Sequence, residues 1–274
     1  MFTLVAGTGY TGKRVLERLP ADSVAGLSRT QIETDRPFHR YDFDAPGAWP
    51  VDLPQRYAVL YTCPPGGEDD ERLRSFLRAL PHAPSRFIYI STTGVYGDHQ
   101  GAVVTEESAV NPKSPMSKPR VAAETLLQHA ASEQAFDLVV LRVPGIYGPG
   151  RLGIDRLKEG GAVLREQDAS PGNRIHVDDL ASCCVAALDA PAGIYNVGDG
   201  DHRSSTWFSD EVARQAGLPE ARKITRAEAE EEFSAMRLAF LSSSRRVDTT
   251  KMREVLGITP RTPEEGIRDS LSGL

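Results

Sequence analysis

The feature that most constrains this fold lies at the start of the chain, where an apolar run meets three closely spaced glycines. Phe2–Ala6 has the composition of a β-strand and passes directly into Gly-Thr-Gly-Tyr-Thr-Gly at 7–12, and Thr11–Leu19 has helical spacing. In such a unit the first glycine allows a tight turn, the second lets a phosphate approach the backbone, and the third lets the helix pack closely. Because strand and helix supply the required context, the pattern predicts binding of a dinucleotide pyrophosphate.

Short β-branched and aromatic runs then alternate with longer stretches that have apolar residues at helical spacing. Continuous apolar strands separated by helices indicate a parallel sheet covered on both faces. We therefore expect an α/β fold, a Rossmann-type doubly wound parallel sheet with a small, interleaved C-terminal substrate lobe. The expected core covers 1–146 with 172–198 contributing a helix and a strand, and the expected lobe covers 147–171 and 199–274. The expected strands are Phe2–Ala6, Ser23–Leu27, Tyr57–Thr62, Arg86–Ser91, Leu138–Val143 and Gly193–Val197, and the sheet helices are Thr11–Leu19, Asp69–Leu80, Arg120–Ala131 and Asp178–Leu188.

The end of the second strand predicts which dinucleotide binds. An acidic residue there would bind the ribose 2′-hydroxyl of NAD and repel a 2′-phosphate, but this chain has Ser28 and Arg29. A guanidinium can form two hydrogen bonds to a phosphate, and a serine hydroxyl can donate a further one. NADP(H) is therefore predicted over NAD(H), the alternative being that Arg29 is simply solvated.

Two further turns follow predicted strands and are expected to contact the cofactor. Asp42 is expected near the adenine amino group and Phe43 along the adenine ring, although a surface acidic turn would have the same sequence. The turn at Cys63 and Pro64 is expected to pass under the phosphates or ribose. The residues predicted to bind the dinucleotide are Gly7, Thr8, Gly9, Tyr10, Thr11, Gly12, Ser28, Arg29, Asp42, Phe43, Cys63 and Pro64.

Composition excludes several classes of partner. The chain has 32 Lys and Arg against 38 Asp and Glu, a net charge of −6, and no basic stripe, so nucleic acid is not an expected partner. No apolar run approaches the roughly 20 residues of a membrane span, and the sequence opens on a strand, so a cytoplasmic location is expected. The 3 cysteines form no ligand spacing, and no metal site is predicted. The expected partner is a small-molecule substrate.

Four later segments resemble a known family. They are Arg-Phe-Ile-Tyr-Ile-Ser-Thr-Thr-Gly-Val-Tyr-Gly at 86–97, Leu-Arg-Val-Pro-Gly-Ile-Tyr-Gly-Pro-Gly-Arg at 141–151, Arg-Ile-His-Val-Asp-Asp-Leu-Ala at 174–181 and Gly-Ile-Tyr-Asn-Val-Gly at 193–198. In this order, and together with the glycine loop, they resemble the extended short-chain dehydrogenase/reductases, which include the NAD-dependent epimerase/dehydratases of nucleotide sugars. The resemblance implies an oxidoreductase, epimerase or dehydratase acting on a sugar nucleotide or a small carbonyl or hydroxyl compound.

The resemblance also implies catalytic positions, and one of them is altered. Thr92 matches the hydroxyl residue that binds the substrate oxygen, and Arg120 falls in the lysine position of the family's Tyr-x-x-x-Lys motif, which places Met116 in the tyrosine position. A second register puts Ser114 there instead, so neither contains a tyrosine. Because Pro119 is tolerated only in a first helical turn, the helix is expected to begin near Ser117. The chain is therefore an atypical member whose proton donor is missing.

Tyr147 and Tyr96 lie on segments that border the substrate cleft in this family, and Tyr147 is the predicted substitute for the missing acid. Arg151 follows in a loop that lies near substrate, or shapes its site, in the family. Two functions stay open: an enzyme that uses Thr92, Tyr147 and Arg120, or a non-catalytic NADP(H)-binding redox sensor or regulator. The resemblance further suggests a possible homodimer through residues 72–78 and 121–127.

Overall fold

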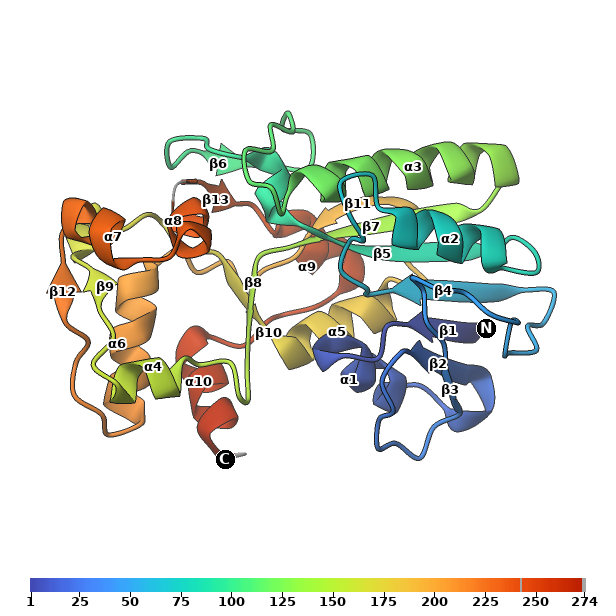
Figure 1. Ribbon diagram of the computed structural model, residues 1–274, viewed down its shortest axis with the longest axis horizontal. Coiled ribbons are helices and arrows are strands. Elements are labelled where there is room, and N and C mark those ends of the chain that lie inside the picture. Colours follow the sequence, from blue (N-terminus) through green and yellow to red (C-terminus); the bar gives the residue numbers. More distant parts are fainter. Residues whose placement is uncertain (242, 273–274) are drawn as a thin grey trace.

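A seven-stranded parallel sheet forms the centre of the protein (Figure 1). The structure is a computed structural model and describes residues 1–241 and 243–272. The strand order is β11-β7-β5-β4-β1-β2-β3, which reverses direction between β1 and β4, and the expected Rossmann-type α/β fold is confirmed. The strands are β1 (Phe2–Ala6), β2 (Val24–Ser28), β3 (Phe38–Arg40), β4 (Tyr57–Tyr61), β5 (Arg86–Thr92), β7 (Asp137–Val143) and β11 (Gly193–Asn196).

Helices cover both faces of the sheet because successive strand residues point to opposite sides. In β1, Val5 packs in a cluster with α1 (Tyr10–Arg18) and α5 (Val177–Ala186). Its neighbours Leu4 and Ala6 pack in a second cluster with α2 (Glu71–Ala79) and α3 (Lys118–Gln134). The strands are therefore apolar on both faces, which explains their continuous apolar runs.

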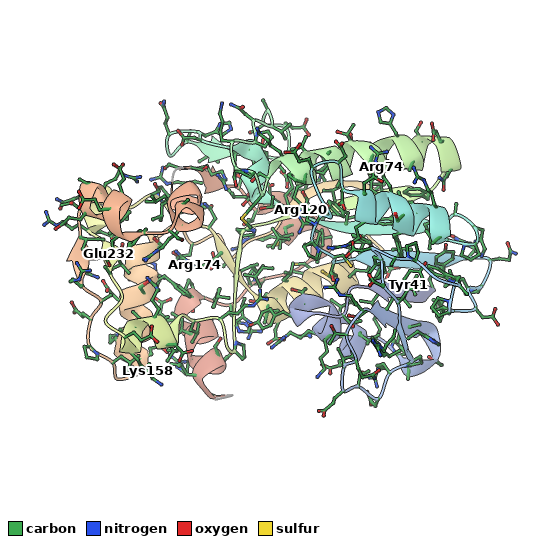
Figure 2. All side chains as sticks on the ribbon, viewed as in Figure 1. Tyr41, Arg74, Arg120, Lys158, Arg174 and Glu232 are labelled. Atoms are coloured by element: carbon green, nitrogen blue, oxygen red, sulfur yellow. The ribbon has the colours of Figure 1, made fainter. Side chains whose placement is uncertain are left out.

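A second, smaller lobe lies beside the carboxyl ends of the strands, at the left of Figure 1. Its short parallel pair is β9 (Val163–Leu164) with β12 (Lys223–Ile224), and it has two apolar clusters of its own. Figure 2 places Lys158 and Glu232 in this lobe and Arg174 between the lobe and the sheet. Its helices are α4 (Ile154–Lys158), α6 (Ser205–Gln215), α7 (Arg226–Glu232), α8 (Ala235–Leu241) and α10 (Pro263–Ser272).

One helix within the range expected for the lobe packs on the sheet instead. Met252 and Leu256 of α9 (Thr250–Leu256) are buried in the cluster that holds α1 and α5. The smaller elements join the two parts or cap strands: β6 (Val103–Val104) pairs with β13 (Arg246–Val247), β8 (Gly145–Tyr147) pairs with β10 (Arg174–His176), and the 3₁₀ turns are η1 (Ala21–Ser23), η2 (Thr93–Tyr96) and η3 (Glu166–Asp168). Over the described ranges, no helix has both the length and the apolar character needed to cross a membrane.

Candidate functional site

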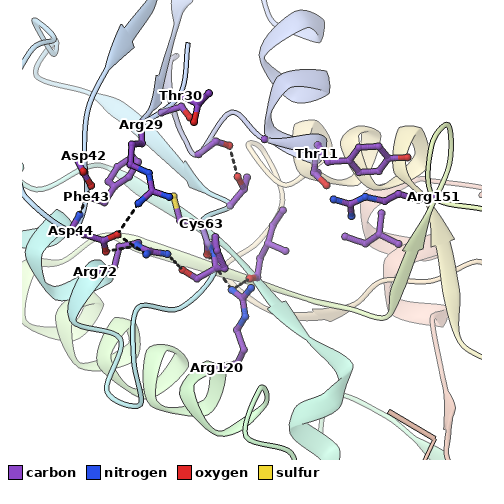
Figure 3. A pocket seen from close by; sticks show the side chains of 18 residues that line it. Thr11, Arg29, Thr30, Asp42, Phe43, Asp44, Cys63, Arg72, Arg120 and Arg151 are labelled. Carbon is purple, nitrogen blue, oxygen red and sulfur yellow. Dashed lines mark hydrogen bonds and ion pairs between the residues drawn. The ribbon is translucent and has the colours of Figure 1, made fainter. Parts of the chain in front are cut away.

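A cavity of about 440 Å³ opens at the carboxyl ends of β1, β2, β4 and β5, within the range of small-molecule sites (Figure 3). It lies where the strand order reverses, which is where doubly wound sheets bind ligands. Most of the predicted residues line it, whereas Thr8, Gly12, Thr92 and Tyr147 do not. The lining residues are Gly7, Gly9, Tyr10, Thr11, Ser28, Arg29, Thr30, Asp42, Phe43, Asp44, Thr62, Cys63, Pro64, Arg72, Ile90, Arg120, Ile146 and Arg151.

The glycine loop has the shape that the sequence pattern requires. Gly7 adopts φ +94, and a Cβ added to Gly12 would stand 1.9 Å from the Gly7 carbonyl oxygen. The Thr62 hydroxyl donates to that same carbonyl and fixes the turn, a role that the sequence did not reveal. Gly9 is different, because nothing lies within 4 Å of the position a Cβ would take. The backbone at Gly9 is therefore open to a ligand, at the N-terminal end of α1.

Two arginines and one carboxylate form the end of the cavity at β2. Nε and Nη2 of Arg72 donate to the two carboxylate oxygens of Asp44, at 2.7 Å each, and Nη1 donates to the Pro64 carbonyl oxygen at 2.8 Å. Arg29 lies 3.5 Å from Asp44, and its side chain is 66% exposed. The hydrogen bonds from Arg72 hold the pKa of Asp44 below its usual range. Asp44 is therefore a fixed anion, held mainly by Arg72.

The neighbouring turn contributes less open surface than the sequence suggested. Asp42 accepts a hydrogen bond from the backbone N–H of Asp44 at 3.0 Å, which shapes the turn. Phe43 is 5% exposed and packs edge-on or tilted against Tyr41, Tyr61 and Phe76. Phe43 lines the cavity from within an aromatic cluster, and its contact with adenine stays a prediction.

The floor of the cavity is formed by Cys63 and Arg120. Nη1 of Arg120 donates to the Ile90 carbonyl oxygen at 2.8 Å, to the Tyr89 hydroxyl at 3.1 Å and to the Cys63 carbonyl oxygen at 3.4 Å. Arg120 thus ties the end of β4 to β5, and its other N–H groups have no partner among the described residues. Burial raises the pKa of the Cys63 thiol to about 12, so Cys63 adds no negative charge to the cavity.

Thr92 is the last residue of β5, two positions after Ile90, which lines the cavity. Its hydroxyl oxygen accepts from the Gly94 N–H at 3.1 Å, as the cap of η2. A Cβ on Gly94 would stand 2.5 Å from the Ser117 hydroxyl and 3.3 Å from that of Thr92, so both hydroxyls adjoin Gly94. The sequence indicated Ser117 only as the start of the helix, and α3 does begin directly after it, at Lys118.

A buried ion pair between α3 and β7 lies beside the end of β5. Glu124 of α3 binds Arg142 of β7 at 2.7 Å, with both side chains 5% exposed, and accepts a short hydrogen bond from Ser91. Arg142 also donates to the Tyr96 hydroxyl at 3.0 Å. Tyr96 in turn donates to Asn196 at 2.7 Å, so it is a packing and network residue rather than a cavity residue.

The predicted substitute for the missing acid does not meet the other catalytic residues at this cavity. Tyr147 is 4% exposed, and its ring packs edge-on against His176 at 5.3 Å and Phe208 at 5.1 Å. Burial raises the pKa of Tyr147 far above its ordinary value, and its hydroxyl has no hydrogen-bond partner among the described residues. Met116, in the tyrosine position of the motif, is 66% exposed. Within the described chain, no cluster of three His, Cys, Asp or Glu side chains could hold a metal ion.

Comparison with known proteins identifies the relatives of this arrangement. Residues 71–198 match the NAD dependent epimerase/dehydratase family. The predicted family resemblance is thereby confirmed. Among solved structures, a functionally unknown conserved protein from Silicibacter pomeroyi DSS is 27% identical with a TM-score of 0.83, over 100% of this chain and 99% of that one. The family match begins after the glycine loop. The cavity is therefore lined partly by residues within the matched range and partly by residues that precede it.

Curated proteins match this chain over only part of their length. Protein YeeZ of Escherichia coli (strain K12) is 30% identical over 146 residues, covering 51% of this chain and 49% of that protein. UDP-glucose 4-epimerase of Mycolicibacterium smegmatis is 30% identical over 201 residues, covering 66% of this chain and 60% of that protein. The chain thus spans about half the length of the curated relatives it matches. These matches show similarity to an NAD(P)-binding, oxidoreductase-like family, and they do not identify the substrate.

Proposed function

We propose that this protein binds NADP(H) in the cavity and acts as an oxidoreductase, epimerase or dehydratase on a sugar nucleotide or a small carbonyl or hydroxyl compound. The observation that carries the proposal is the open backbone at Gly9, which lies between the α1 N-terminus and a cavity of about 440 Å³. Backbone N–H groups at such a helix start favour a pyrophosphate. The residues present therefore fit a dinucleotide.

The choice of NADP(H) rests on how Asp44 is neutralised. Arg72 holds Asp44 through two short hydrogen bonds, whereas Arg29 makes a single 3.5 Å contact with it. Arg29 is thus free to turn to a 2′-phosphate without leaving Asp44 unpaired. Ser28, at the end of β2, lines the same part of the cavity and can add a hydrogen bond.

Titration of the free protein with NADPH and NADH tests this choice. We expect Arg29→Ala to weaken NADPH binding by about 10- to 100-fold, the usual cost of lost charged hydrogen bonds, and to leave NADH binding unchanged. Arg74→Ala, which removes an exposed arginine of α2 paired only with Glu71, is the matched control. Equal binding of NADPH and NADH, with Arg29→Ala changing neither, would show that the NADP(H) assignment is wrong.

The chemistry follows from the residues around Thr92. A bound nicotinamide would supply or accept a hydride. The Thr92 hydroxyl would hydrogen-bond the substrate oxygen, and the free N–H groups of Arg120 would bind cofactor ribose or phosphate. For a carbonyl substrate, the hydride would go to the carbon and a proton from water would go to the oxygen. Without a positioned acid the rate is expected to be lower by roughly 100- to 10,000-fold.

NADPH oxidation with aldehydes, ketones and sugar nucleotides tests catalysis. We expect Thr92→Val to abolish any turnover and Thr92→Ser to retain most of it, while both variants bind NADPH like the wild type. Turnover that survives Thr92→Val would remove Thr92 from the reaction.

A second candidate function is a non-catalytic NADP(H) sensor or regulator. The observation that favours it is the exposed Met116 in the tyrosine position, together with the enclosed hydroxyl of Tyr147. This candidate predicts NADPH binding without turnover on any substrate. It also predicts that amide hydrogen exchange differs between the NADPH and NADP⁺ complexes, because a sensor must distinguish the two forms. Identical exchange in the two complexes would contradict it.

A further inference from the structure

Arg151 reaches the glycine loop from a distant part of the chain. It lies in the loop after β8, and its guanidinium carbon stands 3.8 Å from the ring centre of Tyr10, the first residue of α1. The Tyr10 hydroxyl donates to the Pro149 carbonyl oxygen at 3.0 Å, which fixes the same loop. Gly148 allows this approach, because it adopts φ +151 and a Cβ there would stand 2.6 Å from the Tyr10 hydroxyl.

Arg151 and Arg14 both lie against Tyr10, but they differ in whether nearby groups compensate their positive charge. Arg14 also stacks on the Tyr10 ring, at 4.4 Å, but its guanidinium donates to the Tyr10 carbonyl oxygen at 2.8 Å and lies 3.5 Å from Asp178. In residues 1–241 and 243–272 the Arg151 guanidinium has neither a hydrogen bond nor an ion pair. Its side chain nevertheless lines the cavity together with Gly9 and Thr11. Arg151 therefore presents an uncompensated cation to the ligand.

The position of Arg151 in the cavity indicates which anion it meets. Figure 3 shows Arg151 beside Thr11, at the opposite end of the cavity from Arg29 and Asp44. The open backbone of Gly9 and the first turn of α1 lie at the Arg151 end, and this helix start is the expected place of a pyrophosphate. A 2′-phosphate, in contrast, belongs to the Arg29 end.

We propose that Arg151 is a clamp for the cofactor pyrophosphate, closing over it from the loop after β8 while the α1 N-terminus binds it from the other side. This inference rests on the proposed dinucleotide function. A planar guanidinium supported on the Tyr10 ring is well suited to the role, because its forked N–H groups can bind two phosphate oxygens at once. Binding of the cofactor thereby joins the glycine loop to the chain segment that leads into the second lobe.

Four ligands that differ in their phosphate groups distinguish the role of Arg151 from that of Arg29. Isothermal titration is made with NADP⁺, NAD⁺, ADP-ribose and 2′-AMP; 2′-AMP has the 2′-phosphate and no pyrophosphate. We expect Arg151→Ala to weaken NADP⁺, NAD⁺ and ADP-ribose by the same factor, roughly 10- to 100-fold, and to leave 2′-AMP unchanged. Arg29→Ala should weaken NADP⁺ and 2′-AMP, which carry the 2′-phosphate, and leave NAD⁺ and ADP-ribose unchanged. Arg151→Lys should fall between Arg151→Ala and the wild type, because it keeps the charge and loses the fork.

Arg14→Ala is the matched control, since it removes the other guanidinium on Tyr10 and should change each affinity by less than about threefold. Arg151 is exposed, so its variants should keep the wild-type melting temperature, which circular dichroism checks. Wild-type affinity of Arg151→Ala for NAD⁺ and ADP-ribose would overturn the clamp. A wild-type protein that binds none of the four ligands would overturn the proposed function itself, and the clamp with it.

Discussion

The carboxyl ends of the strands form two regions, one in which polar groups face the cavity and one in which polar side chains are buried. At the end formed by β1, β2 and β4, where we propose that the cofactor binds and which we call the cofactor end, the backbone of Gly9 and the side chain of Arg29 face the cavity. At the end formed by β5, β7, β8 and β11, where we propose that catalysis takes place and which we call the catalytic end, the polar side chains Glu124, Arg142 and Tyr147 are buried. One end therefore exposes polar groups to a ligand, whereas the polar side chains of the other end are buried and support the fold.

The glycine loop offers the largest expected effect at the cofactor end. Gly12→Ala places a Cβ 1.9 Å from the Gly7 carbonyl oxygen, so we expect it to destabilise the protein by more than about 4 kcal/mol. Gly9→Ala is the matched variant, because its Cβ meets nothing within 4 Å. It should unfold like the wild type in urea and yet lose dinucleotide binding. Wild-type NADPH affinity in Gly9→Ala would show that the pyrophosphate does not approach the backbone there.

Removing the buried ion pair between Glu124 and Arg142 tests whether it stabilises the catalytic end. Arg142→Ala leaves the Glu124 carboxylate buried without its partner, so we expect a loss of about 3–5 kcal/mol in urea denaturation. Arg214→Ala, which removes an exposed arginine paired with Glu211, should cost less than about 1 kcal/mol. Equal losses in the two variants would mean that Arg142 does not stabilise this end of the sheet.

Asp199, a buried carboxyl group, is expected to make the stability of the protein depend on pH. It follows β11, is 8% exposed, and accepts from the Asp201 N–H at 2.8 Å with one oxygen, while its other oxygen has no partner among the described residues. Burial raises the pKa of Asp199 to about 7, in spite of Arg174 and Arg253 nearby. Between about pH 4 and pH 7 the folded protein therefore keeps a proton that the unfolded chain releases, and stability falls as the pH rises.

Asp199→Asn removes that dependence and keeps the hydrogen bond from Asp201. We expect the variant to unfold like the wild type near pH 4 and to be more stable at pH 8 by on the order of 2–3 kcal/mol. Urea denaturation across this range measures the difference. A variant less stable than the wild type at pH 8 would show that Asp199 is held as an anion by the neighbouring arginines.

The sequence predicted the sheet and the glycine loop because local patterns determine both. Phe2–Ala6 is both the predicted and the observed first strand, and the rule that proline enters only a first helical turn placed the start of α3 near Ser117. Burial of both faces of the sheet explains the continuous apolar strands. These features depend on neighbouring residues, so one sequence is sufficient to find them.

Contacts between distant residues were not predictable in the same way. Arg72 was assigned to a possible dimer surface, and nothing in the sequence shows that it binds Asp44, 28 positions away. Tyr147 was chosen because its segment borders a cleft, but the direction of its side chain depends on Phe208 and His176, which come from later in the chain. Helical spacing likewise did not reveal that α9 packs on the sheet.

Tyr147 gives the smallest expected effect and separates fold from catalysis. Its hydroxyl is buried without a partner among the described residues, so Tyr147→Phe should leave stability unchanged or raise it by about 1 kcal/mol, because an unsatisfied buried polar group is costly. If burial also keeps it out of the reaction, any NADPH turnover should be unaffected. A large loss of turnover with unchanged NADPH binding would instead show that the catalytic end opens during the reaction and brings this phenol to the substrate, as the sequence first suggested.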